Sequence, residues 1–181
     1  MTNQSARTTR TTPRRSDVVR QATLGDAEAL AEIHVRSWQA AYAGIFPEEF
    51  LDGLDRGRRA RWWRRFIGDG ATVHVSEADG VVGFCTAGDS DEDGWGEVFA
   101  IYVHPDHWGE GHGYHLLRAG ENRLVEEGHE RALLWVLEAN GRGRRFYERQ
   151  GWTVGRPIRV EEIGGVQVTE LRYEKRLKGD S

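Results

Sequence analysis

The residues best suited to chemistry in this sequence lie in a glycine-rich turn. Gly109, Gly111 and Gly113 fall within five residues, between an apolar run that ends at Val103 and a run with helical spacing. The first N–H groups of a helix have no intrahelical partner and, together with the helix dipole, attract anions. Glycine allows the main chain to curve closely around such an anion. The turn therefore predicts a phosphate-binding loop, with an ordinary strand-to-helix turn as the alternative.

Two common phosphate-binding motifs do not fit this turn. A P-loop needs Gly-Lys-Ser/Thr, and both lysines of the chain lie near its C-terminus. A dinucleotide fingerprint GxGxxG that began at Gly109 or Gly111 would need its third glycine at Tyr114 or Leu116. A P-loop and a Rossmann-type dinucleotide site are therefore excluded.

Three segments together resemble the GNAT superfamily of acetyltransferases. Residues 108–113, WGEGHG, resemble the pyrophosphate loop Q/R-x-x-G-x-G/A of that family, and residues 97–105 resemble its splayed fourth strand. Residues 135–152 resemble its N-x-x-A-x-x-F-Y-E-x-x-G-F motif. The resemblance covers roughly residues 18–177.

Three positions depart from the pattern of the family. Trp108 replaces the usual Gln or Arg, Glu110 replaces a basic residue, and Gly143 replaces alanine. The replacement at position 108 is tolerable, because main-chain amides and not this side chain bind the phosphates. The carboxylate of Glu110 would be unfavourable beside a pyrophosphate unless it pointed to solvent.

The resemblance implies both a fold and a cofactor. The expected fold is α/β (α+β mixed), with a mixed, mostly antiparallel sheet of about seven strands that is flanked by helices. A V-shaped splay between strands four and five is expected to hold acetyl-CoA (coenzyme A). The residues that the resemblance assigns to the coenzyme are Phe99, Ile101 and Val103, then Trp108, Gly109, Glu110, Gly111, His112, Gly113 and Tyr114, and finally Asn140, Arg144 and Tyr147.

Two residues are expected to carry the catalysis. Tyr147 matches the general acid of the family, and a core tyrosine is its alternative. Glu97 is the expected general base, because an attacking amine must lose a proton; a solvated edge position is its alternative. Glu138 is the second choice for the base. Asn140 is expected to bind the pantetheine amide, although asparagine is equally suited to begin a helix.

An aromatic wall is expected on the acceptor side. Trp38 and Tyr42 are four apart and share a helix face; with Phe46 they resemble the acceptor wall of the family, and core packing is the alternative. Such a wall, with the acidic loop at residues 89–93, favours a cationic primary amine. No metal site is expected, because His112 and His115 lie at a helix N-terminus, where the dipole opposes a cation.

Periodicity and turn residues predict the elements that hold these residues. Helices are expected at 27–41, from Pro47, and at 58–67, 111–127 and 140–150. Strands are expected at 18–22, 71–78, 81–88, 95–103, 131–137, 152–160 and 166–176. Trp62 and Trp63 cannot both face one side of a helix, so at least one should pack in a core or an oligomer surface. This order predicts a mixed-sheet domain.

Length and charge set further limits. The chain has 181 residues and a net charge of −4, which suits a single domain. Residues 1–16 are expected to form a flexible basic arm, 17–177 one N-acetyltransferase domain, and 178–181 a tail. Without its basic arm the chain is acidic, which argues against nucleic-acid binding. The sequence has no apolar run long enough for a membrane span and no secretory signal, so a cytoplasmic protein without a membrane partner is expected.

The expected function is transfer of the acetyl group of acetyl-CoA to a primary amine of a small molecule by direct attack in a ternary complex. Two alternatives stay open: a protein or peptide N-terminal or lysine acetyltransferase, and a non-catalytic acyl-CoA-binding module. The resemblance also implies a homodimer.

Overall fold

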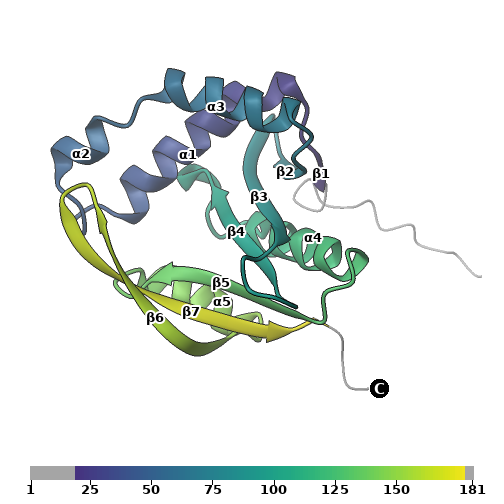
Figure 1. Ribbon diagram of the computed structural model, residues 1–181. Coiled ribbons are helices and arrows are strands. Elements are labelled where there is room, and N and C mark those ends of the chain that lie inside the picture. The colour runs from purple at the N-terminus through teal and green to yellow at the C-terminus, as the bar shows by residue number, and fades with distance from the viewer. Residues whose placement is uncertain (1–18, 178–181) are drawn as a thin grey trace, which may run out of the picture.

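The computed structural model describes residues 19–177, which form one seven-stranded sheet with helices on both faces (Figure 1). The strand order is β1-β2-β3-β4-β5-β7-β6, and every pair is antiparallel except β4 with β5. The strands are β1 Val19–Gln21, β2 Val73–Glu77, β3 Val81–Asp89, β4 Gly96–Val103, β5 Arg131–Leu137, β6 Thr153–Ile163 and β7 Val166–Arg176. The helices are α1 Ala27–Ala41, α2 Glu48–Asp52, α3 Arg56–Gly68, α4 His112–Glu126 and α5 Gly141–Arg149. The predicted fold class is confirmed.

The sheet opens into a V between β4 and β5. The two strands pair only at Gly96 with Ala132 and at Glu97 with Leu133, and they diverge beyond these residues. A bulge in β4 adds to the divergence, because Thr86 of β3 pairs with Ala100 and the next residue of β3 pairs with Val98. The backbone groups of β4 that face β5 are therefore free along most of the strand.

Two apolar cores hold the sheet between its helices. On one face, α1 and α3 pack on β2 and β3 through a cluster that includes Leu30, Trp63 and Phe84. On the other face, α4 packs so closely on β3 that a Cβ atom at Gly120 would lie 2.8 Å from the sulfur of Cys85. These contacts fix the start of α4, and with it the glycine-rich turn, beside the open end of β4.

The other predictions about the elements are either confirmed or concern residues that the structure does not describe. Trp63 is buried and its neighbour Trp62 is 46% exposed, as the helical spacing required. Thr23 and Asp26 form a capping box before α1, since the carboxylate of Asp26 accepts a hydrogen bond from the backbone N–H of Thr23 at 2.7 Å. The predicted N-terminal arm and C-terminal tail lie outside the described residues. Within residues 19–177, no helix has the length and apolar character needed to span a bilayer.

Candidate active site

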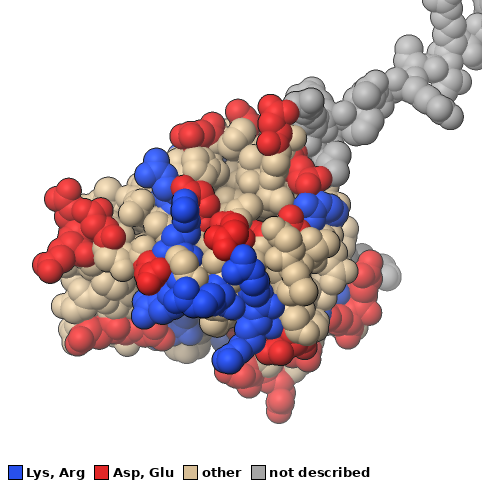
Figure 2. All heavy atoms as spheres, turned by 90° about the horizontal axis from the view of Figure 1, so that it is seen from above, with Lys and Arg blue, Asp and Glu red and all other residues tan. Residues whose placement is uncertain are grey.

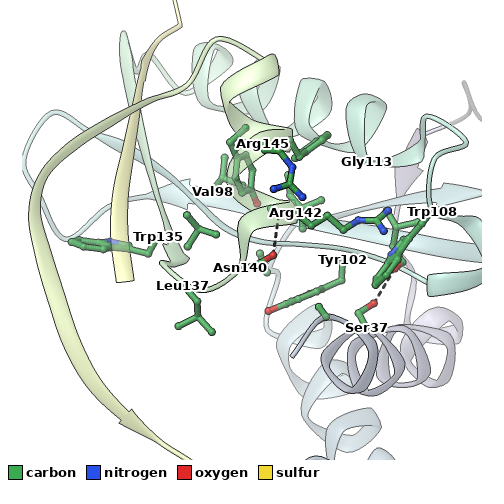
Figure 3. A pocket seen from close by; sticks show the side chains of 18 of the residues that line it. Ser37, Val98, Tyr102, Trp108, Gly113, Trp135, Leu137, Asn140, Arg142 and Arg145 are labelled. Atoms are coloured by element: carbon green, nitrogen blue, oxygen red, sulfur yellow. Dashed lines mark hydrogen bonds between the residues drawn. The ribbon is translucent and has the colours of Figure 1, made fainter. Parts of the chain in front are cut away.

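A cavity of about 580 Å³ occupies the V of the sheet (Figure 3). Its walls come from α1, β4, β5, the start of α4, α5 and the β6–β7 hairpin. Most of the predicted site residues line it, including Glu97, Ile101, Asn140 and Tyr147. The topology therefore brings together the segments that resemble the GNAT motifs.

The glycine-rich turn presents free amides to this cavity. Gly109 and Gly111 have φ angles of 90° and 97°, which L-residues with side chains rarely adopt. Gly111 is the N-cap of α4 and offers no side-chain acceptor to the first turn of the helix. Nothing lies within 4 Å of a Cβ placed on Gly109. An open cradle of unsatisfied N–H groups fits the pyrophosphate of the coenzyme.

Trp108 has a structural role that the sequence did not suggest. Its indole N–H donates to the carbonyl oxygen of Val103 at 2.7 Å, and the hydroxyl of Ser37 donates to the same oxygen at 3.0 Å. Trp108 therefore ties the loop to the end of β4. The predicted main-chain contact of Val103 needs one correction: Val103 lines the cavity, but its carbonyl oxygen already accepts these two hydrogen bonds, which leaves its backbone N–H for the coenzyme.

The predicted coenzyme contact from Arg144 also needs correction. Arg144 does not line the cavity; its side chain donates to the hydroxyl of Tyr173 at 3.3 Å and to the carbonyl of Glu138 at 3.2 Å. Arg142 lines the cavity instead, with its guanidinium carbon 3.8 Å from the ring centroid of Trp108 (Figure 3). Partial burial lowers the pKa of Arg142. Arg142 supplies the positive charge that the loop itself lacks.

Glu110 lies outside the cavity lining. Its carboxylate is 2.9 Å from Nδ1 of His107 and 3.6 Å from Nε2 of His112. The hydrogen bond with His107 holds the pKa of Glu110 below its usual value. The side chain of Glu110 is therefore not a coenzyme contact, although its backbone remains in the loop. These three side chains have ligand atoms within 4.8 Å of one another.

Asn140 lies both at the start of α5 and at the wall of the cavity. Its side-chain oxygen accepts a hydrogen bond from the backbone N–H of Gly143 at 2.9 Å, so Asn140 is the N-cap of α5. The same residue lines the cavity, where its side chain also interacts with the hydroxyl of Tyr42.

The two predicted catalytic residues line the same cavity. Burial raises the pKa of the Tyr147 phenol, so the hydroxyl keeps its proton at neutral pH. Burial also raises the pKa of Glu97, which accepts a hydrogen bond from the Ser90 hydroxyl at 3.3 Å. Glu138, the second choice for the base, is exposed and does not line the cavity.

The acceptor wall is smaller than predicted. Trp38 and Tyr42 line the cavity, and Trp38 donates a hydrogen bond from its indole to the hydroxyl of Tyr102 at 3.0 Å. Phe46 does not line it: this residue is 4% exposed and stacks behind Trp38 with ring centroids 5.8 Å apart. The predicted contact of Phe46 with substrate is therefore wrong, because Phe46 is a core residue. Tyr102, which was not predicted, is part of the wall.

Long-range strand pairing adds residues to the acceptor side. Arg159 of β6 lies over the ring of Trp135 at 4.3 Å and donates to the carboxylate of Glu170 on β7. All three line the cavity. No local motif marks them; they meet because β7 lies between β5 and β6.

Comparisons with known proteins agree with this site. The sequence matches the acetyltransferase (GNAT) family over residues 28–152. It is 33% identical over 160 residues to the uncharacterised N-acetyltransferase YuaI of Bacillus subtilis. The aligned region covers 84% of this chain and 89% of YuaI. The sequence is 25% identical over 167 residues to spermidine N(1)-acetyltransferase of Thermoplasma acidophilum, which covers 86% of this chain and 97% of that one.

A solved structure with its cofactor shows the same fold. The yncA protein of Salmonella typhimurium, in complex with acetyl-CoA, has a TM-score of 0.67 and 25% identity, over 91% of this chain and 95% of yncA. The fold and the cavity define an acyltransferase of the GNAT type. The chain belongs to the GNAT family, and it is an acetyl-CoA-dependent N-acetyltransferase.

Proposed function

We propose that this chain acetylates the primary amine of a small molecule by direct attack within a ternary complex. The observation that carries the proposal is that a carboxylate and a phenol, Glu97 and Tyr147, line one cavity with the phosphate cradle at its end. An amine and a thioester held together in such a cavity would react without a covalent enzyme intermediate. Acetyl-CoA, when bound, supplies the acyl group as a thioester.

The residues of the chain divide the proton transfers between them. Glu97 accepts a proton from the attacking amine, directly or through water, because its carboxylate lines the cavity and burial raises its pKa. Tyr147 gives a proton to the departing sulfur, which its raised pKa allows. Free main-chain N–H groups of β4 near Ile101 stabilise the oxyanion.

The shape of the acceptor side supports a small molecule over a protein. The tip of the β6–β7 hairpin lies beside α2, where a Cβ on Gly164 would be 2.6 Å from the ring of Phe50 (Figure 1). Ile163 and Val166 pack in the same cluster with Leu51. This contact narrows the space beside the acceptor side of the cavity, which favours a small acceptor over an extended peptide. The relationship to a spermidine acetyltransferase also supports small amines.

Two further expectations belong to this proposal. We expect the protein to work in the cytoplasm, where acetyl-CoA is available. We also expect a homodimer, for which the outer strand β6 offers Val154, Ile158 and Val160, each more than half exposed.

The release of free coenzyme A thiol from acetyl-CoA tests the proposed function. A panel of diamines, amino acids, arylalkylamines and lysine- or N-terminus-bearing peptides would be supplied as acceptors. We expect thiol release with at least one small primary amine and much less with peptides. Release with peptides alone would favour the protein acetyltransferase, and coenzyme binding without release on any amine would favour the binding module.

A further inference from the structure

A second cavity, of about 360 Å³, adjoins the active-site cavity beneath α3. Its walls are largely aromatic, with Trp62, Trp63 and Phe66 from α3, Phe84 from β3 and Phe99 from β4. Phe99 and Ala100 of β4 line both cavities, so the two lie next to each other along that strand. Trp62 and Phe99 are 46% and 55% exposed. An aromatic groove left open beside an acceptor site suits an apolar ligand.

A positive charge without a carboxylate partner lies in this groove. Arg59 lines it and is partly buried, yet no acidic side chain of residues 19–177 pairs with Arg59. Burial lowers the pKa of its guanidinium. Its charge acts on Tyr102 of the active-site wall and on His34. The half-buried guanidinium of Arg59 is therefore available to pair with an anion that enters the groove.

The surroundings would draw an anion toward Arg59. Figure 2 shows Lys and Arg side chains gathered in a band across the face seen from above, where α3 lies. Helix α3 contains six arginines, and among the described residues Arg56 and Arg64 pair with Glu32 and Glu28. This band is positive on a chain that is acidic overall. By contrast, Arg159 in the active-site cavity already pairs with Glu170.

We propose that the groove binds the far end of the acceptor: an arylalkyl amine whose carboxylate pairs with Arg59 and whose ring lies against Phe99 and Trp62. This inference rests on the proposed function. Glu97 lines the active-site cavity, and Ala100, three residues further along β4, lines both cavities. The amine and the carboxylate of the acceptor are therefore separated by an apolar spacer that follows β4. A guanidinium can hold a carboxylate by two parallel hydrogen bonds.

The first experiment measures binding without acetyl transfer. The probe is 3-phenylpropanoate, which has no amine, and its neutral match is 3-phenylpropanamide; both are titrated by calorimetry. We expect Arg59→Gln to weaken the carboxylate about tenfold to a hundredfold and to leave the amide unchanged. Trp62→Ala should weaken both probes. The control is Arg58→Gln, the exposed neighbour on α3, which should bind both probes as the parent does.

The second experiment connects the groove to acetylation. The acceptors are 4-(2-aminoethyl)benzoate and its neutral amide, compared in the parent and in Arg59→Gln. We expect the parent and the control Arg58→Gln to show the lower KM for the carboxylate, and Arg59→Gln to remove that preference. Equal KM values in the parent would overturn the proposal.

The two experiments separate failure of the groove from failure of the proposed function. Equal binding of 3-phenylpropanoate by the parent and Arg59→Gln, or equal loss in Arg58→Gln, would overturn the groove even if small amines are acetylated. Binding that depends on Arg59, with no amine acetylated, would support the groove as an anion site and refute its place in an acetyltransferase reaction.

Discussion

Arg142, and not Arg144, is predicted to hold the phosphates of the coenzyme. The two arginines are two positions apart on α5, so their side chains leave the helix in different directions. Arg142 reaches across the mouth of the cavity to Trp108, whereas Arg144 is held by Tyr173 and Glu138 on the other side. Within residues 19–177, no acidic side chain pairs with Arg142. The two positions therefore form a matched pair for mutagenesis.

The expected loss of coenzyme A affinity in Arg142→Gln follows from the exposure of Arg142. An exposed ion pair contributes up to about 1 kcal/mol, and a hydrogen bond to a charged group about 1.5–3 kcal/mol. Arg142 is exposed in the structure but stacks on Trp108, and a bound pyrophosphate would cover its other side. Arg142→Gln should therefore raise the Kd for coenzyme A about 5- to 150-fold. Arg144→Gln should change that Kd by less than about twofold, within the spread of neutral surface substitutions.

Calorimetric titration with two ligands tests this reasoning. Pantetheine lacks the phosphates, so Arg142→Gln should bind pantetheine as the parent does. Raising the salt from about 0.05 to 0.5 M should weaken coenzyme A binding more in the parent than in Arg142→Gln, because screening acts on the charge that the variant lacks. Parent-like affinity of Arg142→Gln for coenzyme A, or a larger loss in Arg144→Gln, would refute the assignment.

Three further changes have defined outcomes. Tyr147→Phe should lower kcat by about 10²–10⁴ with little change in coenzyme affinity, and full activity would remove Tyr147 as the acid. In the parent, kcat/KM should rise with pH as Glu97 loses its proton at its raised pKa, and Glu97→Gln should abolish this rise. Its residual rate should climb about tenfold per pH unit below a pKa near 10.4, as free amine forms; a pH profile like that of the parent would place the base elsewhere. Glu121→Leu should cost roughly 3 kcal/mol in urea unfolding, because Lys175 at 2.8 Å and the indole of Trp152 at 3.0 Å lose their buried acceptor.

The architecture could be predicted because its signals are local. The change of periodicity near residue 70, the glycine turns and the apolar run at residues 131–137 each mark an element within a few residues of its bounds. The splay of β4 and β5 is different. No local pattern encodes where two strands part, so it came from the resemblance alone.

Side-chain direction on short helices was the main source of error. Arg144 and Glu148 are four apart on α5 and both bond the hydroxyl of Tyr173. That spacing could have marked Arg144 as part of a structural pair. Arg142 had no such signal, because its partner Trp108 is distant in the sequence. The prediction for Phe46 was wrong for a similar reason, since an aromatic residue that follows a helix packs equally well in the wall of a cavity or behind that wall.

Burial has opposite consequences for the two proposed catalytic groups. It raises the pKa of Tyr147, which keeps the proton that a general acid must give. It also raises the pKa of Glu97, which makes the carboxylate a stronger base but disfavours its charged form. A carboxyl whose pKa is raised on folding stabilises the protein only at low pH, and this stability is lost as the pH rises through the raised value. At neutral pH the charged Glu97 therefore lowers the stability of the fold in the protonation state that the reaction requires. Such an opposition between stability and a required charge is expected at a catalytic position and not at a structural one.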